Sequence, residues 1–199
     1  MRRTLVLLTL NEIDGLRAVW PKVPRTSADE IVAVDGGSTD GTREFLASNG
    51  ITVFGQDARG RGEAFRVAFR RVSGDHLVFF SPDVNEEPQD IPRLFDALAS
   101  GADMAIASRF TPGGVNEEDA NWLPLRKWTN QLFTLAANLL WNRGPYIADT
   151  INGFRGVTRT AFVRLAPQSH GYTIEYEMTI RAMKQRMRIR EIPTVEGQR

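Results

Sequence analysis

The sequence predicts a Rossmann-like α/β fold, in which helices cover both faces of a mainly parallel, twisted sheet. Apolar runs of strand length recur through the first half of the chain, amphipathic segments separate them, and glycine or acidic residues follow several of the runs. Uninterrupted apolar runs are typical of parallel strands buried on both faces. Their alternation with helices implies crossover connections. With 199 residues, the chain is long enough for one such domain.

Five apolar runs are the strands expected in the first half. They cover residues 5–10, 29–35, 51–55, 76–81 and 102–108. The helices expected between them cover residues 40–48, 62–72 and 89–99. The last of these has apolar residues at helical spacing, and Pro92 is tolerated in its first turn.

The second half begins with a loop rich in glycine and acidic residues, at 111–121. A long helix should follow, because large apolar residues recur at steps of three and four: Trp122, Leu125, Trp128, Leu132, Leu135 and Leu139. Residues 148–157 indicate a loop and a short strand, 173–186 a helix, and 187–195 a final strand.

Composition excludes several classes of protein. The formal net charge of +1 gives no overall field to attract nucleic acid. Without cysteine there are no disulfides and no thiolate chemistry. No stretch approaches the roughly 18 apolar residues of a membrane span. The apolar N-terminus leads straight into Asn11 and Glu12, so we interpret it as a buried strand and not a signal peptide. We therefore expect a cytoplasmic protein, or one that is peripheral on the cytoplasmic face of a membrane.

Polar and glycine residues follow the second expected strand, in the segment DGGSTDGT (35–42). Ligands of such sheets bind at the carboxyl ends of the strands. The glycines allow a sharp turn and a close approach to a ligand, and Asp35 can accept hydrogen bonds from a base or a ribose. Thr39 or Asp40 can cap the next helix. An ordinary turn would also explain this segment.

The fourth expected strand ends in Ser81-Pro82-Asp83-Val84-Asn85. Mg²⁺ and Mn²⁺ prefer oxygen ligands and often share them with substrate phosphates. Asp83 and Asn85 lie two residues apart on an extended segment, so they can offer two oxygens to one such ion. The alternative is a solvated loop, with Glu86 and Glu87 as surface charges.

Arginines also recur at the expected strand ends and loops. They are Arg59, Arg61, Arg109, Arg126 and Arg199. A guanidinium binds phosphate oxygens through paired donors. Any one of them could be a solvated surface residue, but their shared placement favours phosphate binding.

In order along the chain, these motifs resemble the family 2 glycosyltransferases of the GT-A fold, in the branch of polyprenyl (dolichyl) phosphate mannose or glucose synthases. Each segment is similar to a motif of that family, and together they span nearly the whole chain. The segments are LLTLNE (7–12), VDGGSTDGT (34–42), RGRGEAFRVAF (59–69), LVFFSPDVNEEPQDIPRL (77–94), ASRF (107–110), DTINGFRGVTR (149–159) and GYTIEYEMTIRAMKQRMRIREIPTVEGQR (171–199).

The resemblance implies a single catalytic domain over residues 1–199, with a nucleotide-binding part at about 1–110 and an acceptor-side part at about 111–199. It implies inverting transfer of a mannose- or glucose-type sugar from a donor such as GDP-mannose or UDP-glucose to a polyprenyl phosphate, with Mg²⁺ or Mn²⁺. The donor would contact Leu8, Leu10, Glu12, Asp35, Arg61, Ser81, Pro82, Asp83, Arg109 and Arg199.

The resemblance also implies roles on the acceptor side. Arg126 and Arg155 would suit an acceptor phosphate, and Asp83, Asp149 and Arg126 would be catalytic. A polyprenyl phosphate is already anionic and needs no general base, because positioning and charge stabilisation carry most of the rate. A sugar hydroxyl would need one. Asp149, ahead of Glu177, is then the candidate.

Three departures from the family pattern bear on activity. Ser81 stands where the D-x-D motif has its first carboxylate, Gly36 replaces the second Asp of V-D-D-G-S, and Leu8 and Leu10 replace a proline and an aromatic residue. A hydroxyl is a poorer metal ligand than a carboxylate, so metal affinity should be weaker or the ribose contact altered.

Two other functions remain open. One is a soluble family 2 transferase that acts on a saccharide or small-molecule hydroxyl, and the other is a nucleotide-sugar-binding pseudoenzyme. A nucleotidyltransferase fits less well, because residues 11–22 lack its phosphate loop. Tryptophans near basic residues on the long helix suit a membrane interface, although core packing would explain the apolar stripe equally well.

Overall fold

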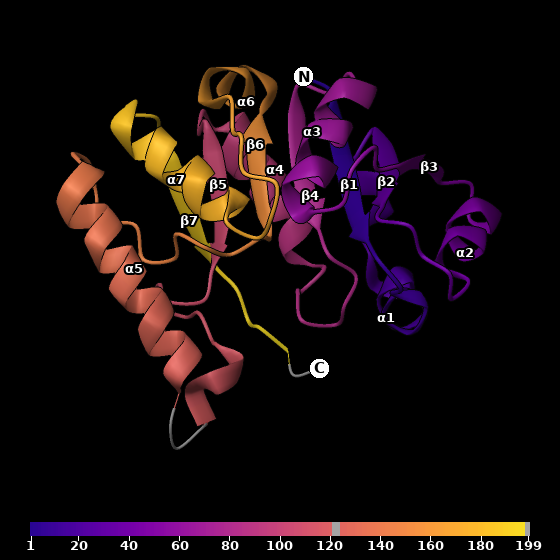
Figure 1. Cartoon of the computed structure of the whole chain (residues 1–199), viewed down its shortest axis with the longest axis horizontal. Coiled ribbons are helices and arrows are strands. Elements are labelled where there is room, and N and C mark those ends of the chain that lie inside the picture. Colours follow the sequence, from indigo (N-terminus) through magenta and orange to yellow (C-terminus); the bar gives the residue numbers. More distant parts are fainter. Residues whose placement is uncertain (121–123, 198–199) are drawn as a thin grey trace.

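Seven strands form a single sheet in this computed structural model, which describes residues 1–120 and 124–197. The sheet order is β3-β2-β1-β4-β6-β5-β7 (Figure 1). The strands are β1 (Arg3–Thr9), β2 (Glu30–Asp35), β3 (Thr52–Gly55), β4 (His76–Phe80), β5 (Met104–Ser108), β6 (Arg155–Thr158) and β7 (Ile189–Pro193). All paired neighbours are parallel except β6, which runs antiparallel to both β4 and β5. The predicted α/β class and mainly parallel sheet are confirmed.

Helices cover both faces of the sheet. They are α1 (Ile13–Val19), α2 (Thr42–Ser48), α3 (Arg61–Arg71), α4 (Asp90–Ala99), α5 (Leu125–Trp141), α6 (Arg159–Leu165) and α7 (Ile174–Lys184). Side chains of β1 alternate between two core clusters: Val6 packs with residues of α3, α6 and α7, whereas Leu7 packs with residues of α1, α2 and α4. This alternation explains why the four central residues of β1, Leu5–Leu8, are all apolar, because both faces of the strand are buried there.

The expected strands and helices match the structure to within a few residues, with two omissions. The helices α1 and α6 were not expected. Each has only seven residues, too few for a helical period to stand out from the neighbouring sequence. Thr158 caps α6 by accepting a hydrogen bond from the backbone N–H of Ala161 at 3.1 Å.

Helix α5 is oriented with its apolar side outward. It lies at the edge of the molecule beside α7 (Figure 1). Its buried residues are Thr134, Ala137 and Asn138. Its exposed apolar residues are Leu125, Trp128, Leu132, Phe133, Leu135, Leu139 and Leu140. The interpretation of the stripe as core packing is therefore wrong for the five stripe residues from Leu125 to Leu139; Trp122 lies outside the described residues.

Polar side chains fix α5 to the rest of the fold. The amide of Asn138 donates to the carbonyl of Ile147 at 2.8 Å and accepts from its N–H at 3.0 Å. The hydroxyls of Thr134 and Thr150 lie 2.8 Å apart. These bonds orient α5 independently of its apolar residues. Across residues 1–120 and 124–197, we find no helix with the length and hydropathy that crossing a bilayer requires.

Candidate functional site

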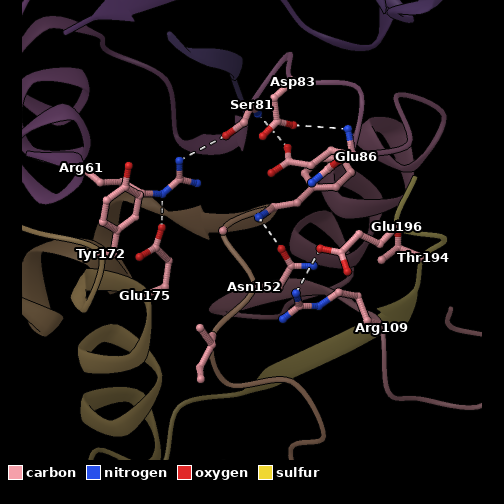
Figure 2. Close-up of a pocket in the computed structure, with 14 residues that line it drawn as sticks. Arg61, Ser81, Asp83, Glu86, Arg109, Asn152, Tyr172, Glu175, Thr194 and Glu196 are labelled. Carbon is pink, nitrogen blue, oxygen red and sulfur yellow. Dashed lines mark hydrogen bonds and ion pairs between the residues drawn. The ribbon is translucent and has the colours of Figure 1, made fainter. Parts of the chain in front are cut away.

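A cavity opens at the carboxyl ends of β4 and β5, between the two halves of the chain. Ten of its lining residues are labelled in Figure 2: Arg61, Ser81, Asp83, Glu86, Arg109, Asn152, Tyr172, Glu175, Thr194 and Glu196. They come from the start of α3, the loops after β4, β5 and β7, the segments before β6 and α7, and α7 itself. Asn85 also lines the cavity. The structure thus brings together five residues expected to bind donor or metal: Arg61, Ser81, Asp83, Asn85 and Arg109.

The loop after β4 carries the candidate metal ligands. The backbone N–H of Asn85 donates to Oδ1 of Asp83 at 3.3 Å. Val84 between them has a φ of 63°, a left-handed conformation that costs a β-branched residue about 1–3 kcal/mol. The surroundings hold this turn, because the N–H of Gly197 donates to the carbonyl of Asn85 at 2.9 Å. On the other side, Gly15 of α1 approaches Pro82 so closely that a Cβ would lie 2.0 Å from its carbonyl oxygen.

Arg61 is held between two elements of the cavity. It forms an ion pair with Glu175 of α7 and donates to Oγ of Ser81 at 3.2 Å. Burial alone would lower the pKa of Arg61, but the carboxylates of Glu175, Glu86 and Asp83 raise it above its usual value. Arg61 is thus a fixed cation that faces the loop after β4. The exposed Arg59, two residues earlier, does not line the cavity.

Arg109 forms ion pairs with two carboxylates of the site. Its Nε and Nη2 donate to Oδ2 and Oδ1 of Asp149 at 2.7 and 3.0 Å, and its Nη1 donates to Glu196 at 3.2 Å. Burial opposes both charges, yet the pKa of Arg109 is raised and that of Asp149 is lowered, because each stabilises the other's ionised form. Only 1% of the Asp149 side chain is exposed.

The interpretation of Asp149 as a general base is therefore corrected. Both of its oxygens are committed to Arg109, and its lowered pKa makes it a weak proton acceptor. Glu177 is not a base for an acceptor either. It accepts from the backbone N–H groups of Gln168 and Ser169, forms an ion pair with Arg181, and does not line the cavity.

Arg155 is the second correction. It is fully buried, and its guanidinium donates to the backbone carbonyls of Asn152 and Glu175 and to the hydroxyl of Thr179. Burial lowers its pKa to about 10. It stabilises the turn before β6 and cannot reach an acceptor phosphate. Arg126 is half exposed at the start of α5, outside the cavity lining, and forms an ion pair with Glu117.

The residues expected at the base and ribose lie at the adjoining ends of β1 and β2. The Asp35 carboxylate accepts from the N–H of Gly37 at 3.0 Å, from the N–H and hydroxyl of Ser38, and from the hydroxyl of Thr9. It therefore shapes its own turn. The N-cap of α2 is Gly41 and not Thr39 or Asp40, but Asp40 accepts from the N–H of Thr42, the first residue of the helix, at 3.0 Å.

The three remaining residues of this group differ in exposure. Leu10 is 55% exposed over Gly36, and Glu12 is half-buried. Leu8 is buried in the core, so its side chain is not placed to contact the donor, and this expectation is corrected. Arg199 lies outside the described residues.

Three cavity carboxylates were not singled out from the sequence. Glu86 is turned inward and accepts from the N–H of Ser81 at 2.7 Å, and burial followed by the charge of Asp83 raises its pKa. Glu175 pairs with Arg61, and Glu196 pairs with Arg109. The interpretation of Glu86 as a surface charge is wrong. Glu175 lies in the helix expected over residues 173–186, which is a weak indication that it could face a site. Glu86 and Glu196 are brought into the cavity only by the tertiary fold.

The oxygens of Asp83 and Asn85 fit a hard divalent cation by type. No cluster of three Asp, Glu, His or Cys side chains able to hold a metal ion occurs within the described residues. A cation here would therefore complete its coordination with phosphate oxygens and water, as Mg²⁺ commonly does. The residues present are compatible with such a shared site.

Comparison with known proteins identifies the class that this fold and site define. The model of the glycosyl transferase family 2 matches residues 4–163, and the chain belongs to that family. It is 30% identical to the polyprenol monophosphomannose synthase of Mycolicibacterium smegmatis, over 96% of this chain and 76% of that protein. It is 28% identical to glycosyltransferase AglJ of Haloferax volcanii, over 94% of this chain but only 60% of that protein.

A solved structure shows the same fold. The chain superposes on glucosyl-3-phosphoglycerate synthase from Mycobacterium tuberculosis, in complex with Mn²⁺, UDP and glucosyl-3-phosphoglycerate, with a TM-score of 0.80. The match covers all of this chain and 72% of that one, at 22% identity. The α/β fold is thus of the GT-A type.

Proposed function

We propose that this chain is the catalytic domain of an inverting glycosyltransferase that moves a mannose- or glucose-type sugar from a nucleotide-diphosphate donor to a polyprenyl phosphate. The observation that carries the proposal is the exposed apolar face of α5, which is joined at its amino end to the wall of the cavity. Membership of family 2 supports the donor class. The similarity to a polyprenol monophosphomannose synthase supports the acceptor class.

The link between the cavity and α5 runs through Glu196. This residue pairs with Arg109 inside the cavity, and its other oxygen accepts from the amide of Asn116 and the N–H of Glu117. Glu117 in turn forms an ion pair with Arg126, in the first turn of α5. If α5 lies on a bilayer, a lipid acceptor in that bilayer would present its phosphate near the wall of the cavity to which α5 is joined.

The outer face of α5 fits a lipid surface better than a coiled-coil partner. On a helical projection its apolar residues span a broad arc, wider than the two-position seam of a coiled coil. Residues Leu125–Trp141 contain no acidic side chain, and the charged residues of this helix are Arg126 and Lys127. An apolar face flanked by basic residues binds at the headgroup boundary. With few net charges available, the contact should be weak and sensitive to salt.

In this mechanism, the donor binds with its diphosphate between Arg61 and the loop that carries Asp83. Asp83 and Asn85 would hold a divalent cation, which would supply positive charge to the departing diphosphate. Arg61 offsets the remaining charge. Arg109 orients the loops after β5 and β7 through Asp149 and Glu196. Glu12 and Asp35 lie where the base and ribose would bind.

An anionic acceptor agrees with the state of the candidate bases. Asp149 and Glu177 are both occupied by cations and backbone donors, so neither is poised to deprotonate a hydroxyl. A phosphate oxygen attacks the anomeric carbon without that step, the bond to the diphosphate oxygen breaks, and the nucleoside diphosphate leaves. Positioning and charge stabilisation then account for the rate.

The test is a transfer assay with radiolabelled GDP-mannose and UDP-glucose and Mn²⁺. The acceptors are a short-chain polyprenyl phosphate, the matching polyprenol without phosphate, and a panel of sugars. We expect label only in the polyprenyl phosphate product. Transfer to a sugar hydroxyl alone would contradict the proposed acceptor. Donor binding without any transfer would favour the pseudoenzyme.

A further inference from the structure

Thr194 follows β7 directly and lines the cavity, with only 5% of its surface exposed. Its hydroxyl has no hydrogen-bond partner among the residues that the structure describes. Buried polar groups of folded proteins are nearly always paired, because a group without a partner loses its hydration and gains nothing in return. A group on the wall of a cavity can find its partner in a ligand. The unpaired hydroxyl of Thr194 therefore indicates a ligand oxygen at this end of the cavity.

The backbone of Thr194 is fixed on both sides. Its N–H donates to the carbonyl of Ser108, at the end of β5, at 3.1 Å, and its carbonyl accepts from the N–H of Val115 at 2.9 Å. These two bonds join the end of β7 to the end of β5 and to the loop that follows it. The main chain thus sets the place of the hydroxyl before a ligand binds, which lowers the cost of ordering on binding.

The charges next to Thr194 favour a neutral ligand. Figure 2 shows Thr194 beside Glu196 and Arg109. Arg109 pairs with both Asp149 and Glu196, so the cluster has two carboxylates and one cation. A phosphate group placed against Thr194 would meet this excess of negative charge, whereas a hydroxyl would not. A ligand hydroxyl can also donate to Thr194 or accept from it.

The order of the strands indicates which part of the donor reaches Thr194. Asp35, near the expected ribose, ends β2, and the loop expected to hold the diphosphate follows β4. The sheet order β3-β2-β1-β4-β6-β5-β7 places β5 and β7 on the far side of β4 from β2. In a nucleotide sugar the sugar likewise lies beyond the diphosphate. A polyprenyl phosphate has no alcohol hydroxyl, so the hydroxyl at Thr194 belongs to the donor sugar.

We propose that Thr194 binds a hydroxyl of the transferred sugar. This inference rests on the proposed function, because it assigns a further contact to the donor site of the same transferase. The nucleoside, the diphosphate and the sugar then lie in this order along the carboxyl edge of the sheet, from β2 to β7.

The variant Thr194→Val removes the hydroxyl and leaves the shape of the side chain nearly unchanged. Thr194→Ser is the conservative variant, because it keeps the hydroxyl and loses only a methyl group. Thr134→Val is the matched control. Thr134 is also buried but does not line the cavity, and its hydroxyl lies 2.8 Å from that of Thr150.

Titration calorimetry with Mn²⁺ compares each nucleotide sugar with its own nucleoside diphosphate: UDP-glucose with UDP, and GDP-mannose with GDP. We expect Thr194→Val to weaken binding of the nucleotide sugar about tenfold, because a sugar hydroxyl is left unpaired, and to leave the affinity for the nucleoside diphosphate unchanged. Thr194→Ser and Thr134→Val should keep the wild-type ratio of the two affinities. An equal effect of Thr194→Val on both ligands would overturn the inference, as would a wild type that binds neither nucleotide sugar.

Thermal unfolding without ligand provides a second readout. Thr194→Val breaks no hydrogen bond of the described structure, so its Tm should equal or exceed that of the wild type. Thr134→Val should lower the Tm, because it takes away the partner of a buried hydroxyl. A Tm lowered as much in Thr194→Val as in Thr134→Val would mean that the Thr194 hydroxyl has a partner inside the protein, against the proposed contact.

These outcomes are separable from those of the transfer assay. If sugar transfer to the lipid phosphate occurs but Thr194→Val binds the nucleotide sugar like the wild type, the sugar contact fails and the proposed function stands. If Thr194→Val weakens only the nucleotide sugar but no lipid product forms, the sugar contact stands and the acceptor is wrong.

Discussion

The cavity and the outer face of α5 depart from the usual distribution of side chains in opposite ways. Around the cavity the fold buries charges: Arg109 and Asp149 are 8% and 1% exposed. On α5 the fold exposes leucines: Leu132 and Leu139 are 67% and 69% exposed, while Thr134 and Asn138 are buried. Buried charges and contiguous exposed apolar groups are the two arrangements that folding alone does not favour.

The difference indicates two separate tasks. Burying a charge costs several kcal/mol unless it is paired. The ion pairs of the cavity offset this cost and hold its arginines in place. An exposed apolar patch lowers solubility and usually marks an interaction surface. The cavity thus has the character of a site for a charged ligand, and α5 that of a surface for an apolar one. Substitutions in one region should leave the task of the other intact.

The largest expected effect is at the cation site. Asp83→Ala should abolish metal-dependent binding of the donor, because it removes the carboxylate at the tip of the loop after β4, while Ser81→Asp should preserve or strengthen it. Titration calorimetry with the productive donor, with and without Mn²⁺, measures both. Donor affinity unchanged in Asp83→Ala would remove Asp83 from the site.

The next effect is on stability at the buried ion pair. Asp149→Asn removes one partner of Arg109, a change that costs about 3–5 kcal/mol in buried pairs. The lower end is expected, because Glu196 still contacts Arg109. Urea unfolding at pH 7 measures the loss in the free energy of unfolding. A loss below about 1 kcal/mol would show that the pair is not a main support of the cavity.

The same pair predicts a pH dependence. The pKa of Asp149 is lowered in the folded protein from about 4 in the unfolded chain. Its ionised form therefore contributes stability that is fully present above the unfolded pKa and is lost as the pH falls through the folded pKa. The difference in unfolding free energy between the wild type and Asp149→Asn should be constant from about pH 5 to 7 and should shrink below about pH 4. A difference that grows on acidification would contradict the assignment.

A smaller effect is expected for membrane contact. Leu132→Glu should reduce retention on vesicles of phosphatidylcholine and phosphatidylglycerol about tenfold or more, because one buried leucine contributes about 1.5–3 kcal/mol. Gln131→Glu adds the same charge to the same helix without removing an apolar group, and should bind nearly like the wild type. Cosedimentation measures both. Equal retention of Leu132→Glu and Gln131→Glu would remove α5 as the lipid surface.

The smallest effect is on the stability of α5 itself. Leu135→Ala should change the free energy of unfolding by no more than about 0.5 kcal/mol, as for other exposed sites. Leu94→Ala in α4, where the leucine is fully buried, should cost about 2–5 kcal/mol. Urea unfolding of both decides the orientation of α5, because a comparable loss at Leu135 would mean that this face is covered in solution.

The same two helices show what periodicity can predict. Both α4 and α5 have apolar residues at helical spacing, and both were expected as helices. Spacing defines an apolar face but not what covers it, and the inward anchors of α5 are the polar Thr134 and Asn138. The parallel strands of the first half were predictable because each is an uninterrupted apolar run. The antiparallel β6 was not predictable in orientation, since that depends on pairing with β4 and β5.

The site was predictable where it follows directly after a strand. Ser81, Asp83 and Arg109 all follow a β-strand closely, so the fold class alone brings them to one edge. Glu86, Glu175 and Glu196 enter the cavity through tertiary contacts that span the chain. Arg155 shows that an arginine at the end of a strand does not always face the site. Its buried guanidinium instead stabilises a turn through hydrogen bonds to the backbone.

The most direct test of these separate tasks, charged-ligand binding in the cavity and lipid contact by α5, is one transfer experiment with two variants. Leu132→Glu and Asp83→Ala are assayed with a long-chain polyprenyl phosphate in vesicles and a short-chain one in detergent. The account predicts that Leu132→Glu loses transfer in vesicles but retains it in detergent, and that Asp83→Ala loses both. Equal transfer by Leu132→Glu and the wild type in vesicles would contradict the account, as would transfer by Asp83→Ala in detergent at the wild-type rate.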